Sequence, residues 1–266
     1  MKKQSIFCAL MSLMAMGVST SCTNVDNPYA PTTPDTKYVV VKDSVITSDG
    51  DVYVYDTEFD AEGKAVKETY TYYYEDGTTD QEVCCFTYGP DLITGEETLS
   101  DGTTSYAYFR LNSKGLVEHY ERASYGIDVR FKYSDDGHVN LVSTPEFSDS
   151  LVWKDDDVVS WIYKDRAVDY VMTDYEIDFP FLMPFDGYDT VLSQLGYFGK
   201  PTRHLVSKLA YESEDENGYN RASQSFDYVV RNGLVMEFTM SAEAVSTAKD
   251  LNESYIVHHY LTWKKL

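Results

Sequence analysis

Cysteine is scarce in this sequence, with four residues in a chain of 266. Cys8 and Cys22 lie near the N-terminus, and the other two, Cys84 and Cys85, are neighbours. Adjacent residues of a strand point to opposite faces of a sheet, so we predict that one of these two thiols packs inward and the other faces outward. A vicinal disulfide between them stays an open alternative. No further pair is left for a disulfide framework or a zinc site, so the fold must be held together by its own core.

Basic residues are also few. The chain has 22 Lys and Arg against 44 Asp and Glu, which gives a formal net charge of −22. Proteins that bind nucleic acid gather Lys and Arg on one surface to neutralise phosphates, so this composition excludes nucleic acid as a partner. An acidic surface also repels anionic lipid headgroups, so membrane residence must depend on a lipid anchor. We interpret the excess of acid as a means of keeping a tyrosine-rich protein soluble.

Long apolar runs are missing. The apolar run near the N-terminus, residues 6–18, is shorter than the roughly 20 residues that a transmembrane helix needs, and no later segment approaches that length. Lys2 and Lys3 precede the run and small residues follow it, which is the layout of a secretory signal. We therefore predict a signal peptide over residues 1–21 and no transmembrane helix.

Small residues lead directly to Cys22, as they do in bacterial lipoproteins, where that cysteine is lipidated and becomes the mature N-terminus. The match departs from the usual pattern at Ser19, where leucine is common, and the alternative is an ordinary secreted protein with an incidental Cys22. Residues 22–37 are rich in Pro, Thr, Asn and Asp and are predicted to form a flexible tether. We expect a protein of the cell envelope, anchored in the outer membrane through Cys22 alone. The residues directly after Cys22 contain a single acid, Asp26, and not the acidic run that is associated with surface export in such organisms, so the side of the membrane stays undecided.

Catalytic motifs are absent as well. The chain contains no G-x-S-x-G, no H-E-x-x-H and no phosphate-binding loop. Ser246 and Lys249 match S-x-x-K, but the S-D-N and K-T-G motifs that accompany it in penicillin-recognising enzymes are missing. His258 and His259 are adjacent on a predicted strand and cannot both ligate one metal, and the other three histidines, His119, His138 and His204, are isolated in the sequence. We predict no enzyme, no cofactor and no metal site.

From residue 38 onward the sequence repeats one pattern. Runs of eight to ten residues rich in Val, Tyr, Phe and Thr alternate with short polar turns that often contain Asp-Gly or Asn-Gly. Such dipeptides supply the positive φ angles of tight hairpins, and β-branched and aromatic residues suit strands. The pattern predicts one all-β domain over residues 38–266, a strongly curved antiparallel meander of about ten to twelve strands. Whether the sheet closes into a barrel or stops as a half-barrel is left open.

Three consecutive aspartates, Asp155 to Asp157, occupy a turn position between two tryptophan-containing runs in LVWKDDDVVSWIY. We interpret them as a solvated hairpin tip on which no core group depends, because Asp tolerates left-handed backbone and can cap its own turn. A calcium site is the alternative, but calcium prefers six to eight oxygens from spaced residues. Strand alternation could place Trp153 near Trp161 on one face, with a register uncertain by a residue.

One segment, residues 178–205, breaks the strand pattern. Apolar residues recur there at helical spacing and glycines end the recurrence, so we predict a short helix at about residues 188–195. Its apolar side is expected to close part of the core of the sheet. A lid over a binding site is the alternative.

The run LVWKDDDVVSW resembles the W-K-D-G-N-[IL]-V hairpin of a family of lipoproteins from gut anaerobes, a domain of unknown function with a porin-like fold. LSQLGYFGKPTRHL and the final YLTWKKL are similar to that family too. This sequence departs from the hairpin pattern at Asp156 and Asp157, where Gly and Asn are usual. The resemblance implies a strongly curved antiparallel sheet and supplies no catalytic residues. We do not expect a pore, because the strands and turns are too polar for a lipid-facing band.

Tyrosine is abundant, with 24 residues. Several form alternating ladders, such as Tyr70 with Tyr72 and Tyr106 with Tyr108. Ladder packing within the sheet explains most of them, and a platform that stacks a ligand is the alternative. Two functions follow: a binding module that presents a concave sheet face to a glycan, peptide or other nutrient, or an assembly protein that binds another envelope protein. A tyrosine-lined concavity would favour the first, and a flat apolar patch or an unpaired sheet edge the second.

Overall fold

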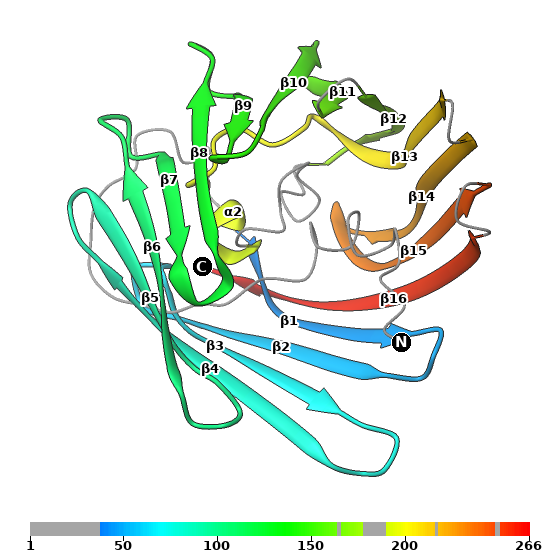
Figure 1. Cartoon of the computed structure of the whole chain (residues 1–266). Coiled ribbons are helices and arrows are strands. Elements are labelled where there is room, and N and C mark those ends of the chain that lie inside the picture. The colour runs from blue at the N-terminus through cyan, green and yellow to red at the C-terminus, as the bar shows by residue number, and fades with distance from the viewer. Residues whose placement is uncertain (1–37, 164–165, 178–189, 216–217, 248–250) are drawn as a thin grey trace.

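Each strand of the molecule pairs antiparallel with the strand that precedes it, and the last strand returns to pair with the first. The computed structural model describes residues 38–163, 166–177, 190–215, 218–247 and 251–266. Within these residues, sixteen strands form a closed barrel, drawn in Figure 1. The barrel closes where Tyr38 to Thr47 run alongside Val257 to Lys265.

In chain order the strands are β1 (Tyr38–Thr47), β2 (Val52–Phe59), β3 (Ala65–Tyr73), β4 (Thr79–Tyr88), β5 (Leu92–Thr98), β6 (Thr104–Leu111), β7 (Val117–Arg122), β8 (Ile127–Tyr133), β9 (Val139–Ser143), β10 (Ser148–Lys154), β11 (Asp157–Tyr163), β12 (Arg166–Glu176), β13 (His204–Asp215), β14 (Gly218–Arg231), β15 (Leu234–Ser246) and β16 (Leu251–Lys265). A 3₁₀ turn, η1 (Ala123–Tyr125), links β7 to β8, and one α-helix, α2 (Thr190–Gln194), precedes β13.

The predicted all-β antiparallel fold is confirmed, but the expected number of strands is too low. The segment LITGEET, which becomes β5, contains a glycine, and the acidic HLVSKLAYESED, which becomes β13, lacks the regular alternation of its neighbours. Both form strands because they pair on each side within the barrel, and such pairing outweighs weak local preference. The choice between half-barrel and barrel is settled by the β1–β16 pairing.

The Asp-Gly turns behave as the pattern predicts. In the β3–β4 hairpin, Gly77 has a φ of 82°, and Asp76 Oδ1 accepts hydrogen bonds from the backbone N–H and the hydroxyl of Thr78. Asp101 and Thr103 repeat this arrangement before β6. These side chains fix each turn locally, so the hairpins need little help from the core.

Strand alternation separates the inside of the barrel from the outside. In β6, Ala107, Phe109 and Leu111 are buried, whereas Tyr106 and Tyr108 between them are exposed. In β4, Cys84 is buried and Cys85 is exposed, so the prediction of opposite faces is confirmed. The barrel interior is filled by apolar side chains, including Phe86, Phe109, Tyr120, Phe131 and Phe198.

Residues 190–203, which we call the plug segment, pack into one end of the barrel, and α2 lies inside the ring of strands in Figure 1. Val191, Leu192, Leu195 and Phe198 are buried, and the Phe198 ring meets the Phe131 ring edge to face with centroids 5.2 Å apart. The predicted helix and its role in closing the core are confirmed, although α2 is only five residues long.

Hydrogen bonds join the plug segment to the barrel wall at separate points around its circumference. The Val40 N–H donates to Gln194 Oε1 at 2.8 Å, the Val117 N–H donates to the Tyr197 carbonyl at 2.9 Å, and the Lys200 N–H donates to the Gly137 carbonyl at 3.0 Å. We call this the plug end of the barrel. It carries the turns that follow the even-numbered strands.

The predicted signal peptide and tether, including Cys22, lie outside the described residues. No helix in the described part of the chain is long and apolar enough to cross a membrane.

Candidate functional site

The aspartate hairpin is a two-residue turn between β10 and β11. Asp155 and Asp156 have φ angles of 53° and 66°, the left-handed pair that the right-handed twist of a hairpin favours. The interpretation of these two residues as a turn is confirmed. Lys154 pairs with Asp157, which is therefore the first residue of β11 rather than part of the tip.

The expectation that no core group depends on these aspartates is wrong. Asp157 is only 9% exposed, and its carboxylate accepts hydrogen bonds from the backbone N–H of His204 at 2.8 Å and from its Nδ1 at 2.7 Å. The Asp156 carbonyl accepts from the Arg203 N–H at 3.0 Å. The hairpin therefore fastens the end of the plug segment to the barrel, through partners 47 residues away that no local pattern reveals.

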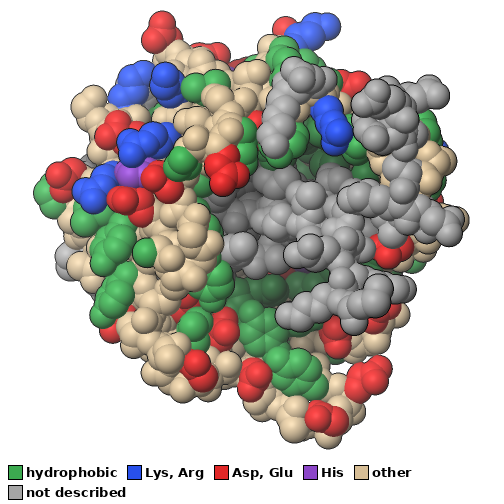
Figure 2. Space-filling model, viewed as in Figure 1, with side chains coloured by type: hydrophobic (Ala, Val, Ile, Leu, Met, Phe, Trp, Pro, Cys, Tyr) green, Lys and Arg blue, Asp and Glu red, His purple; other side chains and the backbone are tan. Residues whose placement is uncertain are grey.

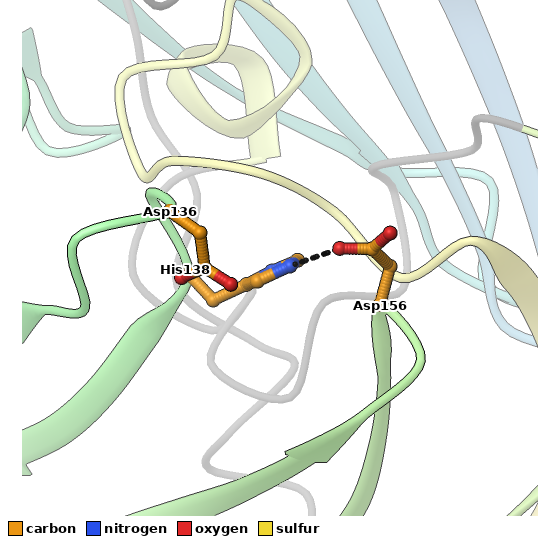
Figure 3. Close-up of side chains that lie close together, drawn as sticks. All are labelled: Asp136, His138 and Asp156. Carbon is orange, nitrogen blue, oxygen red and sulfur yellow. Dashed lines mark hydrogen bonds and ion pairs between the residues drawn. The ribbon is translucent and has the colours of Figure 1, made fainter.

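The Asp156 carboxylate faces the neighbouring hairpin, where it accepts a hydrogen bond of 2.9 Å from His138 Nε2 (Figure 3). This bond, more than any other cause, lowers the pKa of Asp156. Asp136 comes from the same turn as His138, and a hydrogen bond from the Ser134 hydroxyl is the main cause that lowers its pKa. The three side chains bring metal-binding atoms within 4.8 Å of one another.

His138 is held firmly. It is 2% exposed, and its ring stacks on Trp153 with centroids 4.1 Å apart. Trp153 is itself held in place, because its Nε1 donates to the Val139 carbonyl at 2.6 Å. Trp153 and Trp161, which strand alternation could have brought together, are not paired directly: Trp161 is opposite Leu151 and Trp153 is opposite Val158.

The histidines that are isolated in the sequence are paired in the fold. Four of the five bond to an aspartate from another strand or turn, over 2.7–2.9 Å: His119 to Asp128, His138 to Asp156, His204 to Asp157 and His259 to Asp43. His258 instead lies near the Thr239 hydroxyl at 3.0 Å. As expected, His258 and His259 have separate partners.

The opposite end of the barrel, which carries the turns after the odd-numbered strands, presents different side chains on its inner wall. We call it the belt end, after a belt of tyrosines and acids on β2 to β5 and on β7. Its members are Tyr53, Tyr55, Glu68, Tyr70, Tyr72, Glu82, Glu97 and Arg122. Figure 2 shows a hollow in this face of the molecule, with hydrophobic side chains over β2 to β4 and acidic side chains at its margin.

The tyrosines of the belt pair across strands. Tyr53 meets Tyr72 edge to face at 5.4 Å, and Tyr55 meets Tyr70 at 4.7 Å. Burial, followed by the nearby Asp51, raises the pKa of Tyr53 to about 12, and burial also raises the pKa of Tyr72. Tyr53 and Tyr72 keep part of their surface exposed, so the belt offers rigid, neutral ring surfaces at ordinary pH.

Charged groups complete the belt. Glu97 and Arg122 form an ion pair although they are only 2% and 3% exposed, and the Arg122 guanidinium stacks over the Tyr125 ring at 4.1 Å. Glu97 Oε1 and Arg122 Nε have no hydrogen-bond partner within the described part of the chain. Burial, and then the charge of Glu97, raises the pKa of the neighbouring Glu82. Unpaired buried polar atoms are costly, so these groups are candidates for contact with a ligand.

The tyrosine ladders thus divide between two surfaces that the sequence does not distinguish. Tyr70 and Tyr72 face inward, whereas Tyr106 and Tyr108 stack on each other on the outer wall at 6.3 Å. Glu82, Glu97 and Arg122 were not predicted as site residues. A buried charge is visible only once the strands are paired, although an acid at an inward position of an alternating strand is a usable signal.

A solved protein structure has a fold similar to that of this chain. A porin-like protein from Bacteroides uniformis ATCC 8492 has a similar structure, with a TM-score of 0.57 at 14% identity, over 87% of this chain and 99% of that chain. The fold is porin-like. A second porin-like protein, from Bacteroides vulgatus ATCC 8482, aligns over 86% of this chain and 99% of that chain at 12% identity with a TM-score of 0.33. No family model and no curated protein matches the sequence.

Proposed function

We propose that this protein is a non-catalytic binding module of the cell envelope, held by a lipid on Cys22, whose ligand contacts the belt on the inner wall of the barrel. One observation supports this most directly. The buried pair of Glu97 and Arg122 leaves a carboxylate oxygen and a guanidinium N–H without partners, and the charge of Glu97 acts on the part-exposed Tyr72, whose ring contacts Tyr53. A ligand that both donates and accepts hydrogen bonds, and that has a face to stack, matches this set.

A glycan satisfies these requirements best among the ligands considered. Sugar hydroxyls donate to carboxylates and accept from guanidinium groups, and the apolar face of a sugar ring packs on tyrosine. Glu82 and Glu97 supply acceptors, and Arg122 supplies donors. Peptides and other nutrients with hydroxyl or amino groups share part of this chemistry and form the comparison set of the test.

The distribution of side chains supports binding rather than conduction through a membrane pore. Transmembrane barrels of the porin type have a polar lumen and an apolar outer band. Here apolar side chains fill much of the interior, and the outer wall carries ion pairs such as Lys42 with Asp56, Lys67 with Glu58 and Arg110 with Glu121, at 2.9–3.6 Å.

The alternative of an assembly protein has less support. An unpaired strand edge would favour it, but each of the sixteen described strands has a partner on both sides. Exposed apolar residues occur on the outer wall, at Val152, Ile162 and Val171 among others, interspersed with Ser160 and Asp169 in the paired strands.

The test is binding of the purified protein to a glycan array, followed by calorimetry on the hits. Tyr72→Ala and Glu82→Gln should each weaken binding about tenfold or more, since stacking and charged hydrogen bonds each contribute about 1–3 kcal/mol. Tyr106→Ala removes a tyrosine from the outer wall and is the matched control, which should bind like the parent. Equal losses in Tyr72→Ala and Tyr106→Ala would contradict a belt site.

The anchor is tested separately. Cys22→Ala should release the protein from the membrane fraction, because an acidic domain has little affinity for anionic lipid. If the variant still sediments with membranes in high salt and only detergent releases it, the lipid is not on Cys22.

A further inference from the structure

We propose a second site, independent of the belt: a divalent metal site formed by Asp136, His138 and Asp156 at the plug end, with zinc as the preferred ion. The three residues belong to two hairpin tips, Asp136 and His138 to the β8–β9 turn and Asp156 to the β10–β11 turn (Figure 3). The ion would join the two tips directly.

The distances suit a single ion. The ligand atoms lie within 4.8 Å of one another, and His138 Nε2 is 2.9 Å from Asp156 Oδ1. Nitrogen and oxygen ligands bind zinc at about 2.0–2.2 Å, so two of them in a tetrahedral site are about 3.3–3.6 Å apart. The His138–Asp156 pair therefore needs to open by only a few tenths of an ångström, and small side-chain rotations bring Asp136 into range.

His138 provides the observation that separates this cluster from an ordinary acidic surface. The side chain is 2% exposed, one ring nitrogen points at Asp156, and the other, Nδ1, lacks any hydrogen-bond partner in the described ranges. A histidine that binds a metal uses one ring nitrogen for the ion and carries its proton on the other. Here Nε2 faces the two carboxylates, so Nε2 would bind the ion and Nδ1 would carry the proton. Stacking on Trp153 already fixes the ring, so little ordering is required on binding.

The backbone of both tips is equally well fixed. The Gly137 carbonyl accepts from the Lys200 N–H and the Asp156 carbonyl accepts from the Arg203 N–H, both at 3.0 Å. Asp136 and Asp156 are exposed, so an ion can enter from solvent.

The donor set selects the ion. One imidazole and two carboxylates match zinc, with water completing the coordination. Calcium prefers six to eight oxygens, which this cluster cannot supply. The Lys200 ammonium acts on both carboxylates electrostatically, although no direct ion pair joins it to either of them among the described side chains. Lys200 is therefore a competitor for the position of the ion, and its removal should strengthen binding.

The experiment is calorimetric titration of the full-length protein, stripped with a chelator, with zinc chloride and with calcium chloride. We expect one zinc ion per chain and a zinc-dependent rise in melting temperature, with weaker calcium binding. Asp136→Asn should weaken zinc binding about tenfold or more, as loss of a ligand exceeds loss of an outer-shell contact. Lys200→Gln should tighten it several-fold.

Two further variants complete the test, one that removes the histidine ligand and one that serves as a control. His138→Gln retains a donor toward Asp156 and should abolish zinc binding, and circular dichroism of this variant checks the barrel. Asp76→Asn changes an aspartate of the equivalent β3–β4 turn that has no neighbouring histidine ligand in the described structure, and it should bind zinc like the parent. Absence of saturable zinc binding, or zinc binding that Asp136→Asn and His138→Gln leave unchanged, would overturn the site.

Discussion

The two ends of the barrel use the same strand architecture for opposite purposes. At the plug end, apolar residues of α2 and the segment after it fill the interior. His138–Asp156 joins two turns, Arg203 bonds the plug segment to Asp156, and His204–Asp157 holds the start of β13. At the belt end, the inner wall carries tyrosines, carboxylates and a buried ion pair with unpartnered atoms. The histidine–aspartate pairs at the plug end join parts of the fold, although His138 Nδ1 has no hydrogen-bond partner in the described ranges, whereas the polar groups of the belt line the inner wall where we propose that a ligand binds.

The comparison teaches where to look for function in a regular meander. Each described strand runs from one end of the barrel to the other, so the composition of a strand alone does not distinguish the two ends. The useful distinction is whether buried polar atoms have partners, because an unpartnered one is retained against a cost in stability.

The largest expected effect comes from breaking the plug end. Phe198→Ala should lower the free energy of unfolding by about 3–5 kcal/mol, because the fully buried ring packs against Phe131 and its loss leaves a cavity. Urea denaturation followed by tryptophan fluorescence measures this. Tyr125→Ala, at an exposed position of the belt end, should cost far less, and a similar cost for both would remove the contrast between the ends.

A smaller loss is expected for Asp157→Ala, about 1–3 kcal/mol, because two donors of His204 lose their acceptor at a buried position. Comparing the denaturation of Asp157→Ala with that of Asp155→Ala separates the effect of losing the hydrogen bonds from the effect of changing the turn. If Asp157→Ala is as stable as the parent, the hairpin is only a tip and does not fasten the plug segment.

The two ends should also differ in their response to pH. The pKa of Asp156 is lowered by its bond with His138, so this contribution is present above the ordinary pKa of Asp and is lost as pH falls through the lowered value. The pKa of Tyr53 is raised to about 12, so its contribution is present below the ordinary pKa of 10.0 and is lost as pH rises toward about 12.

Melting curves across pH, with tyrosinate absorbance on the alkaline side, check both signs. Asp156→Asn removes the titrating carboxyl group and should reduce the dependence on the acid side only, and Tyr53→Phe should reduce it on the alkaline side only. If either variant instead changes the pH dependence of melting on the other side of the pH range, the assignment of these groups to separate ends is contradicted.

The smallest effect is expected at the tip of the aspartate hairpin. Asp155→Gly should stabilise the protein by about 0.4–1 kcal/mol, because glycine adopts the φ of 53° without strain and one of several adjacent charges disappears. Thermal melting resolves a shift of this size. Asp156→Gly gains the same backbone freedom but loses the bond from His138, so it should be less stable than Asp155→Gly.

Much of the fold follows from local sequence. Alternating apolar residues predict the strands, Asp-Gly pairs such as Asp76-Gly77 predict the hairpins, and the spacing of Val191, Leu192, Leu195 and Phe198 predicts the short helix. These features succeed because each depends on neighbours in the chain, through backbone preference and the two-residue period of a strand. The predicted count of strands is at least four too low, and β5 and β13 are two of the strands whose local patterns are weak.

Tertiary structure decided everything that depends on distant partners. Closure of the barrel requires β1 to meet β16, about 220 residues away. The pairing of His204 with Asp157, the assembly of Asp136, His138 and Asp156, and the inward direction of Glu97 and Arg122 have the same origin. By itself the sequence determined the all-β hairpin architecture and the acidic, cysteine-poor character of the chain. Which polar side chains meet, and which are left without partners, depends on strand register around the closed barrel, because a shift of one residue would turn every one of them to the opposite face.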